Sequence, residues 1–369
     1  DDRIVQAGVG FVIAPDVLAA RISGHIENRD GRYTNAFTGE KDNAIEDSVI
    51  RGQLLARAGG NFEALLGVHY RKYRTTGGYW TIGSYRADGI YRNGYAPPTD
   101  RDAVNTNAEE FSDTEQFGGS LKLDWDFGAA TLTSITGYER YEVSSGGDND
   151  YTPLEIARNH TEARSEQWSQ ELRLASNGSS RLKWIVGLYY FKEDIDSDAA
   201  SATLPNGTVP ALPGDTAPDA YSLTRYVHGA ESGAAFANVG YDLTDTINLT
   251  VGGRFTRETK TLDFRRFSSA ASTPTAPVAA PSWSNYAQWW SSYTGGFGGL
   301  GTFAGNLERT WDNFTYDVTP SWTVAPGHLL YFKFSHGVKS GGFNTAAQVP
   351  AALQVVEPEK LDAFEIGYK

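Results

Sequence analysis

The feature that most constrains the fold of this chain is a two-residue alternation of apolar and polar side chains. It is clearest in residues 163–196. Every second residue of the later part is large and apolar: Leu182, Trp184, Val186, Leu188 and Tyr190. Period two is the spacing of a β-strand with one apolar and one polar face. Asn177 and Gly178 supply the residues that a short hairpin turn requires, so we predict an antiparallel hairpin across this stretch.

Composition narrows the environments in which such strands fold. No apolar run approaches the roughly 18 residues that a membrane helix needs. The chain has no cysteine, which excludes a disulfide framework and thiolate metal sites. Its net charge of −13 argues against a nucleic-acid partner. A soluble β-sandwich and a membrane barrel both remain compatible with these facts.

The spacing of turns and loops separates these two architectures. Alternation predicts about thirteen strands, each of about ten residues. Tight turns are predicted at residues 14–16, 59–60, 128, 177–178, 243–246 and 326–327. Along the chain these turns alternate with long loops, with one strand between each turn and the next loop. Sandwiches scatter their loop lengths over both ends, whereas an outer-membrane barrel has short periplasmic turns and long extracellular loops. We therefore predict an all-β, transmembrane antiparallel barrel.

The polar face of these strands carries charges that would line the lumen. We expect them to form an ion-paired wall around a plug or a water-filled channel. The predicted lumenal residues are Arg21, Glu27, Arg51, Arg71, Glu171, Arg173, Arg254, Lys333 and Glu365.

Several segments, taken in order, resemble a known family. They are LTSITGYER, QELRLAS followed by LKWIVGLYYF, AAFANVGYDLTDTINLTVGGRFTRETK, YFKFSHGVKSGGFN and EPEKLDAFEIGYK. Together they resemble the barrel of TonB-dependent outer-membrane receptors, most closely those of the iron-complex type. The resemblance implies a barrel of about 22 strands, an N-terminal plug domain and a TonB box. We expect residues 1–369 to be part of that barrel domain, with the plug and the last strands absent from this sequence.

The resemblance also implies a function. Such a protein lies in the bacterial outer membrane, contacts its lipid, and takes up a ferric siderophore or other iron complex. Energy comes from the inner-membrane TonB complex acting through the plug. The iron chelate is a transported ligand, and no covalently bound cofactor is expected. Uptake of oligosaccharides or aromatic compounds is an alternative within the same class. A passive porin or a surface receptor is an alternative outside it, and no feature indicates an enzyme.

Two predicted extracellular loops are candidates for ligand binding. In the first, arginines would pair with an anionic chelate while aromatic rings stack on it. Its residues are Tyr79, Trp80, Tyr85, Arg86, Tyr91, Arg92 and Tyr95. The second loop is rich in tryptophan, which suits sugar rings or apolar ligands. Its candidates are Trp283, Trp289 and Trp290. Packing of each loop on itself is the alternative for both.

Three other features of the sequence are weaker candidates for a functional site. GFGGLG at residues 296–301 matches a dinucleotide-binding spacing, but no strand leads into it and no helix pattern follows. The histidines are scattered, so we predict no metal site. Asp148, Asn149 and Asp150 are compatible with a Ca²⁺ loop, although three polar residues beside glycines more often form a solvated turn.

Overall fold

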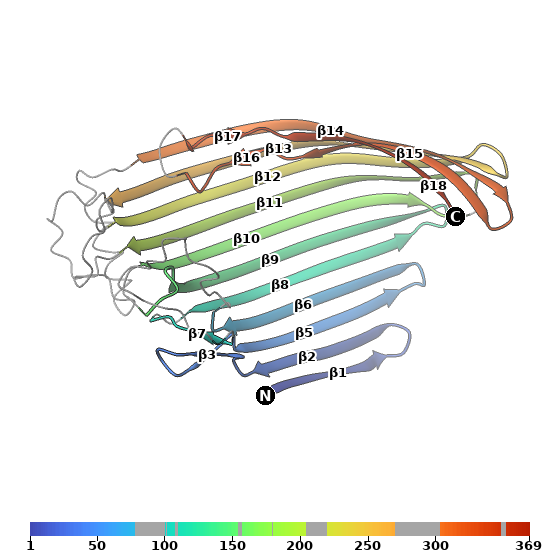
Figure 1. The fold of residues 1–369 in the computed structure, drawn as a ribbon. Coiled ribbons are helices and arrows are strands. Elements are labelled where there is room, and N and C mark those ends of the chain that lie inside the picture. Colours follow the sequence, from blue (N-terminus) through green and yellow to red (C-terminus); the bar gives the residue numbers. More distant parts are fainter. Residues whose placement is uncertain are drawn as a thin grey trace.

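The computed structural model describes residues 1–77, 100, 102–107, 110–153, 157–178, 180–203, 220–269, 303–347 and 352–369. Thirteen strands form one antiparallel sheet (Figure 1). No helix in the described part of the chain is long and apolar enough to cross a membrane. In order across the sheet, the strands are β1 (Asp2–Ala14), β2 (Leu18–Arg29), β5 (Ile45–Ala58), β6 (Phe62–Thr75), β8 (Phe111–Asp126), β9 (Ala130–Asp148), β10 (Ala157–Ser176), β11 (Leu182–Thr203), β12 (Ala220–Asp242), β13 (Ile247–Ser269), β14 (Phe303–Ala325), β15 (His328–Lys339) and β18 (Glu359–Tyr368).

The number of strands agrees with the sequence prediction, but their length does not. β11 has 22 residues and β12 has 23, about twice the predicted length. The predicted length of about ten residues was too short, because strand pairing continues through residues 143–148, 157–161 and 197–203. The error arose because alternation of apolar and polar residues marks only the part of a strand that has one apolar face.

Every tight turn lies on one rim of the sheet, and the strand ends that the long connections join lie on the other (Figure 1). Several turns contain a residue with positive φ, as short hairpins require. Asp16 has a φ of 57°, Gly128 of 86° and Gly178 of 92°. The predicted placement of short turns and long loops is thus confirmed.

One face of the sheet, which we call the outer face, is apolar and exposed. Leu188 in β11 lies opposite Leu172 in β10 and Ala235 in β12. The Leu188 side chain is 60% exposed, which indicates a face made for contact with lipid rather than with a protein core. Trp184, Val186 and Tyr190 share this face, as predicted from period two.

Beyond the apolar stretch of the outer face, the long strands carry charged residues. The ring of Trp168 lies 5.4 Å from that of Tyr190, in an aromatic row at the border. Past this row, Lys192 pairs with Asp194 at 3.2 Å, and Arg140 pairs with Glu142. A membrane strand needs only about 9–11 residues. The long strands therefore extend past the hydrocarbon layer, with their ion pairs outside it.

Five short strands lie in the long connections on the loop rim. β3 (Tyr33–Asn35) pairs with β4 (Lys41–Asp42) and with β7 (Ala103–Val104). β16 (Gly342–Phe343) pairs with β17 (Val355–Val356). None of these strands was predicted, because each is too short to show a period.

Candidate functional site

The sequence-predicted ligand residues lie outside the described residues. They are Tyr79, Trp80, Tyr85, Arg86, Tyr91, Arg92, Tyr95, Trp283, Trp289 and Trp290. The same holds for the glycine motif at 296–301. The strands that carry the two loops are described. β6 and β8 flank the first loop and β13 and β14 flank the second, and all four strand ends lie on the loop rim (Figure 1).

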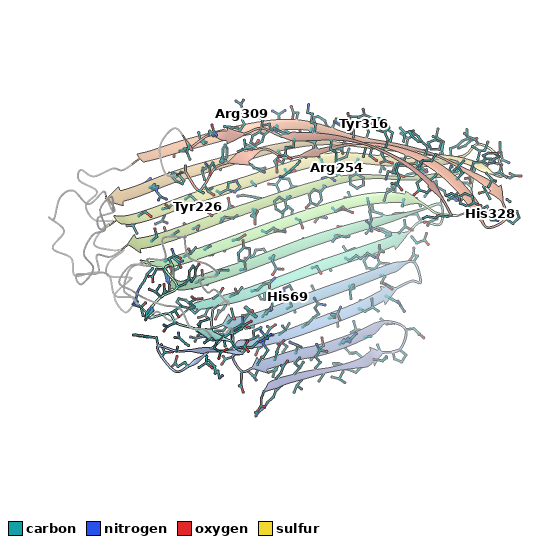
Figure 2. All side chains as sticks on the ribbon, in the orientation of Figure 1. His69, Tyr226, Arg254, Arg309, Tyr316 and His328 are labelled. Carbon is teal, nitrogen blue, oxygen red and sulfur yellow. The ribbon has the colours of Figure 1, made fainter. Side chains whose placement is uncertain are left out.

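The face opposite the outer face, which we call the lumenal face, is the functional surface that the structure describes. It carries all nine of the predicted lumenal charges, because strand register places them on the side away from Leu188. Register connects, for example, Ser23 to Arg51 and Arg51 to His69. Figure 2 shows side chains on both faces along the strands.

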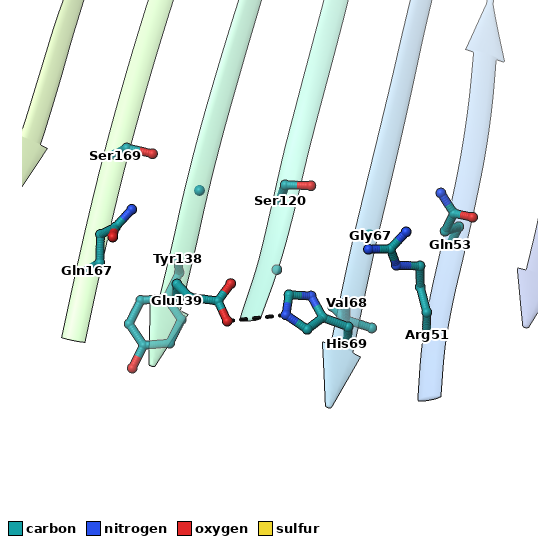
Figure 3. A pocket seen from close by; sticks show the side chains of 12 residues that line it. Arg51, Gln53, Gly67, Val68, His69, Ser120, Tyr138, Glu139, Gln167 and Ser169 are labelled. Atoms are coloured by element: carbon teal, nitrogen blue, oxygen red, sulfur yellow. Dashed lines mark hydrogen bonds and ion pairs between the residues drawn. The ribbon is translucent and has the colours of Figure 1, made fainter. Parts of the chain in front are cut away.

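A polar hollow of about 380 Å³ lies on the lumenal face across β5 to β10 (Figure 3). Its floor is made of small residues, among them Gly67, Gly137 and Ser120. Longer polar side chains form its walls. These are Arg51, Gln53, His69, Glu139 and Gln167. The mixture of cation, carboxylate, imidazole and amide suits a polar partner.

A bridge between two strands crosses this hollow. His69 Nε2 lies 3.2 Å from Glu139 Oε1, although β6 and β9 are separated by β8. Gly118 of β8 is in register with both residues. A Cβ at position 118 would collide with the Glu139 carboxylate and lie 2.7 Å from His69 Cε1. Glycine is therefore required for the bridge to close.

The predicted ion-paired wall is only partly present. Arg71 donates to both carboxylate oxygens of Asp47 at 2.9 and 2.8 Å, and Arg173 donates to Glu171 at 3.1 Å. Among the described residues, Arg21, Arg51, Arg254 and Lys333 have no carboxylate at ion-pair distance. The expectation of an ion-paired wall therefore holds only in part. Register sets Arg21, Arg51 and Arg254 opposite residues without a carboxylate, whereas Lys333 lies opposite Glu365 but beyond ion-pair distance.

One of these cations is held by aromatic rings instead. The Arg254 guanidinium carbon lies 5.2 Å from the centre of the Tyr189 ring and 5.8 Å from that of Phe236 (Figure 2). The Phe236 ring lies over Gly187, where a Cβ would collide with it. Arg254 Nε donates to Thr256 Oγ1 at 3.1 Å. This leaves a positioned cation on the lumenal face.

The connection between β15 and β18, which we call the lumenal strap (residues 340–347 and 352–358), folds onto the lumenal face of β12 to β14. Its apolar core contains Leu262, Phe264 and Ala347, which are 1%, 0% and 1% exposed. Leu307, Phe343 and Leu353 pack around them. A predicted external loop thus partly covers the inner wall.

Polar contacts hold both ends of the lumenal strap. Lys260 Nζ donates to the carbonyl of Gly341 at 2.8 Å. Trp311 Nε1 donates to Glu357 Oε2 at 2.9 Å. The Trp311 ring also lies so close to Gly341 that a Cβ there would be 2.6 Å from it. Large residues at the lumenal positions 262, 264 and 311 were the sequence signal for a covered wall, and it was missed.

The possible Ca²⁺ motif forms a turn at the loop rim. The Asp148 carboxylate accepts backbone N–H groups from Asp150, Tyr151 and Asn107. Burial, reinforced by the Asp150 carboxylate, raises the pKa of Asp148 to about 7. The described residues hold no group of three or more His, Asp or Glu arranged around a metal. The Asp148 oxygens instead shape the turn.

Comparison with known proteins identifies a family and several solved structures that resemble this chain. Residues 56–369 match the family described as TonB dependent receptor-like, beta-barrel. The ferric yersiniabactin uptake receptor FyuA of Yersinia pestis is 14% identical, with a TM-score of 0.75 over 100% of this chain and 50% of that one.

Two further receptors show a similar fold. The siderophore receptor PiuA of Acinetobacter baumannii is 15% identical, with a TM-score of 0.66 over 99% of this chain and 52% of that one. The ferric-catecholate import receptor Fiu of E. coli K12 is 12% identical, with a TM-score of 0.65 over 100% of this chain and 54% of that one. This chain therefore spans about half the length of the structures that it matches.

Proposed function

This chain belongs to the family of TonB-dependent receptor β-barrels, and from that premise we propose that the complete protein takes up an iron chelate across the bacterial outer membrane. The observation that carries the proposal is the contrast between the two faces of one sheet. The outer face exposes Leu188 and its apolar neighbours, whereas the lumenal face carries a polar hollow and cations that have no carboxylate partner in the described part of the chain. Such a wall suits the passage of a polar, anionic solute.

The ligand class is supported by charge and by the similar structures. Ferric chelates are often anionic, and the lumenal face presents Arg21, Arg51 and Arg254 free of ion pairs among the described residues. The receptors FyuA, PiuA and Fiu are named for siderophore or ferric-chelate uptake. The residues of the two predicted ligand loops would make the first contact with such a chelate.

Energised transport requires a partner beyond this chain. We propose that a plug domain of the complete protein fills the lumen and engages the inner-membrane TonB complex. The polar hollow around His69 and Glu139 would then face the plug surface. A hydrated, polar interface of this kind can rearrange at a low cost in free energy, because water replaces the hydrogen bonds that are broken.

The proposal is tested by uptake in cells that lack their own iron-chelate receptors. The complete receptor is expressed with and without functional TonB. Radioactive iron is supplied as ferric citrate, as a ferric catecholate and as a ferric hydroxamate. Uptake of at least one chelate that disappears without TonB is the expected result. Uptake that persists without TonB would instead indicate a passive pore, and uptake of none would contradict the iron assignment.

A second candidate function is uptake of oligosaccharides or aromatic compounds. The tryptophan-rich segment with Trp283, Trp289 and Trp290 favours it, because indole rings stack on sugar faces. The same cells, supplied with labelled maltooligosaccharides, distinguish this function from iron uptake.

A further inference from the structure

Three turns on the rim that carries the tight turns are joined to one another by hydrogen bonds. The carbonyl of Asn61, in the turn between β5 and β6, accepts the backbone N–H of Asp126 at 2.8 Å. Asp126 ends β8, and its Oδ1 accepts a hydrogen bond from Asn177 Nδ2 at 2.8 Å. Asn177 lies in the turn between β10 and β11. Its side-chain amide therefore connects two hairpins rather than serving its own turn alone.

Both ends of the Asn177 amide group are held. Nδ2 donates to Asp126, and Oδ1 accepts a hydrogen bond from Thr131 Oγ1 at 2.9 Å. The backbone N–H of Asn177 also donates to the carbonyl of Ala129 at 2.9 Å. These partners lie 46 to 51 residues earlier in the chain. The contacts therefore exist only when β9 and β10 have paired in their native register.

The residue after Asn177 gives this amide a chemical reactivity. Gly178 has a φ of 92° and carries no side chain that would block its backbone nitrogen. Asparagine is thermolabile in proteins, and a following glycine favours its deamidation. The Gly178 nitrogen attacks Asn177 Cγ, and closure of a cyclic imide releases ammonia. Water then opens the imide at one of its two carbonyls, which leaves aspartate or isoaspartate. The reaction consumes only water.

The folded sheet opposes this attack. Cγ reacts only when the amide group turns toward the Gly178 nitrogen and comes within contact distance of it. That rotation would break both side-chain hydrogen bonds, of which one is made to a carboxylate. In an unfolded chain neither partner is close. We propose that Asn177 is a deamidation site that is open before the sheet forms, and that its bonds to Asp126 and Thr131 shield it afterwards.

Deamidation would damage the contact between the turns. An aspartate at position 177 places a carboxylate oxygen where Nδ2 now donates to Asp126, and two negative charges at that distance repel each other. Isoaspartate also lengthens the backbone of the turn by one methylene group. A chain that reacts before it folds therefore joins its two turns less well. The modification distinguishes copies of the receptor that folded late from copies that folded early.

The test is peptide mass spectrometry of the complete receptor after incubation at mildly alkaline pH, either folded in detergent or unfolded in urea. Asn93–Gly94 and Asn206–Gly207 have the same dipeptide and provide the internal reference in urea, where all three sites should react at similar rates. In the folded receptor, deamidation of Asn177 should be at least about tenfold slower than in urea, because two hydrogen bonds must break first. Equal rates in the two conditions overturn the proposal.

A conservative variant separates the two hydrogen bonds from the general rigidity of a hairpin. Thr131→Val keeps the shape of the side chain but removes the donor to Asn177 Oδ1. It should accelerate deamidation of Asn177 about fivefold in the folded receptor and leave the rate in urea unchanged. Heat-modifiable gel mobility verifies that the variant folds.

Thr133→Val is the matched control for this variant. Thr133 lies on the same strand and face, and its hydroxyl donates to Asp124 Oδ1 at 2.7 Å rather than to Asn177. The control should leave deamidation of Asn177 unchanged. Equal rates in the two variants, or slower deamidation in Thr131→Val, would overturn the proposed shielding. The measurement needs no transport, so its outcome is independent of the proposed function.

Discussion

His69 and Glu139 form a hydrogen-bonded bridge over Gly118, the residue that lies between them in register on β8. Side chains on the same face of two strands separated by a third normally do not meet. Here they do because the middle residue has no side chain. The bridge therefore depends on three strands at once and connects the walls of the polar hollow.

The first prediction concerns this glycine. Gly118→Ala should break the His69–Glu139 bridge, since its methyl group would occupy the position of the carboxylate. The expected loss of unfolding free energy is about 1 kcal/mol, the value of one hydrogen bond, because Glu139 can turn toward open space. Urea unfolding measures it. Gly60→Ala is not a suitable control because its φ is 75°. Ser120→Ala, on the same strand and face, is suitable and should cost less.

The second prediction concerns the outer face. Leu188→Arg should destabilise the folded barrel by about 2–4 kcal/mol, because it places a charge in the hydrocarbon layer. Unfolding of the complete receptor in lipid vesicles measures the change. Gln167→Arg is the control, since Gln167 lies on the lumenal face between Glu139 and Glu193 in register. Equal effects of the two substitutions would contradict the assignment of the faces.

The third prediction concerns the lumenal strap. Trp311→Phe keeps an aromatic ring near Gly341 but removes the hydrogen bond to Glu357. Hydrogen exchange in residues 352–358 should become about tenfold faster, which corresponds to loss of one charge-assisted bond. Trp322→Phe, on the outer face and 50% exposed, is the control. If exchange in the strap responds equally to both changes, the Trp311–Glu357 bond does not hold it.

The fourth prediction concerns pH at the loop rim. The pKa of Asp148 is raised to about 7, so the folded rim binds a proton that the unfolded chain releases near pH 4. This raised pKa stabilises the protonated rim at low pH, and its contribution is lost as pH rises toward 7. Hydrogen exchange in residues 102–107 should therefore accelerate between pH 5 and pH 8 beyond the intrinsic rate. In the Asp148→Asn variant this additional acceleration of hydrogen exchange should vanish. If it persists, a group other than Asp148 causes the pH dependence.

The fifth prediction concerns the two loops that the sequence singled out. Changing Arg86 and Arg92 together to glutamine should slow association of an anionic ferric chelate and flatten its salt dependence, because exposed charges mainly accelerate encounter. Changing Trp289 and Trp290 together to alanine should matter less. For a neutral sugar the order should reverse. Ligand binding is measured for both double variants across an ionic-strength series. If neither double substitution changes binding, these loops are not part of the ligand-binding site.

The sequence by itself determined the strand architecture. Period two in residues such as Leu182 to Tyr190, together with tight turns at Gly128 and Gly178, specified the antiparallel sheet, the rim of each turn and the face of each charge. Those are local properties, because a strand's faces follow from its own alternation and a short turn from its own backbone. The family resemblance also came from the sequence, and the match over residues 56–369 confirms it.

The tertiary structure alone decided which side chains meet. Nothing local to His69 or Glu139 reveals that they bridge over Gly118, because the contact depends on the register of three strands. The same applies to Arg21 and Arg51, which have no ion pair with any described residue because register places Gln53 and Ser23 opposite them. It also applies to the lumenal strap, whose contacts with Leu262 and Trp311 join segments far apart in the chain. The alternation within a strand determines which residues share a face of the sheet, whereas the register between strands determines which of their side chains are in contact.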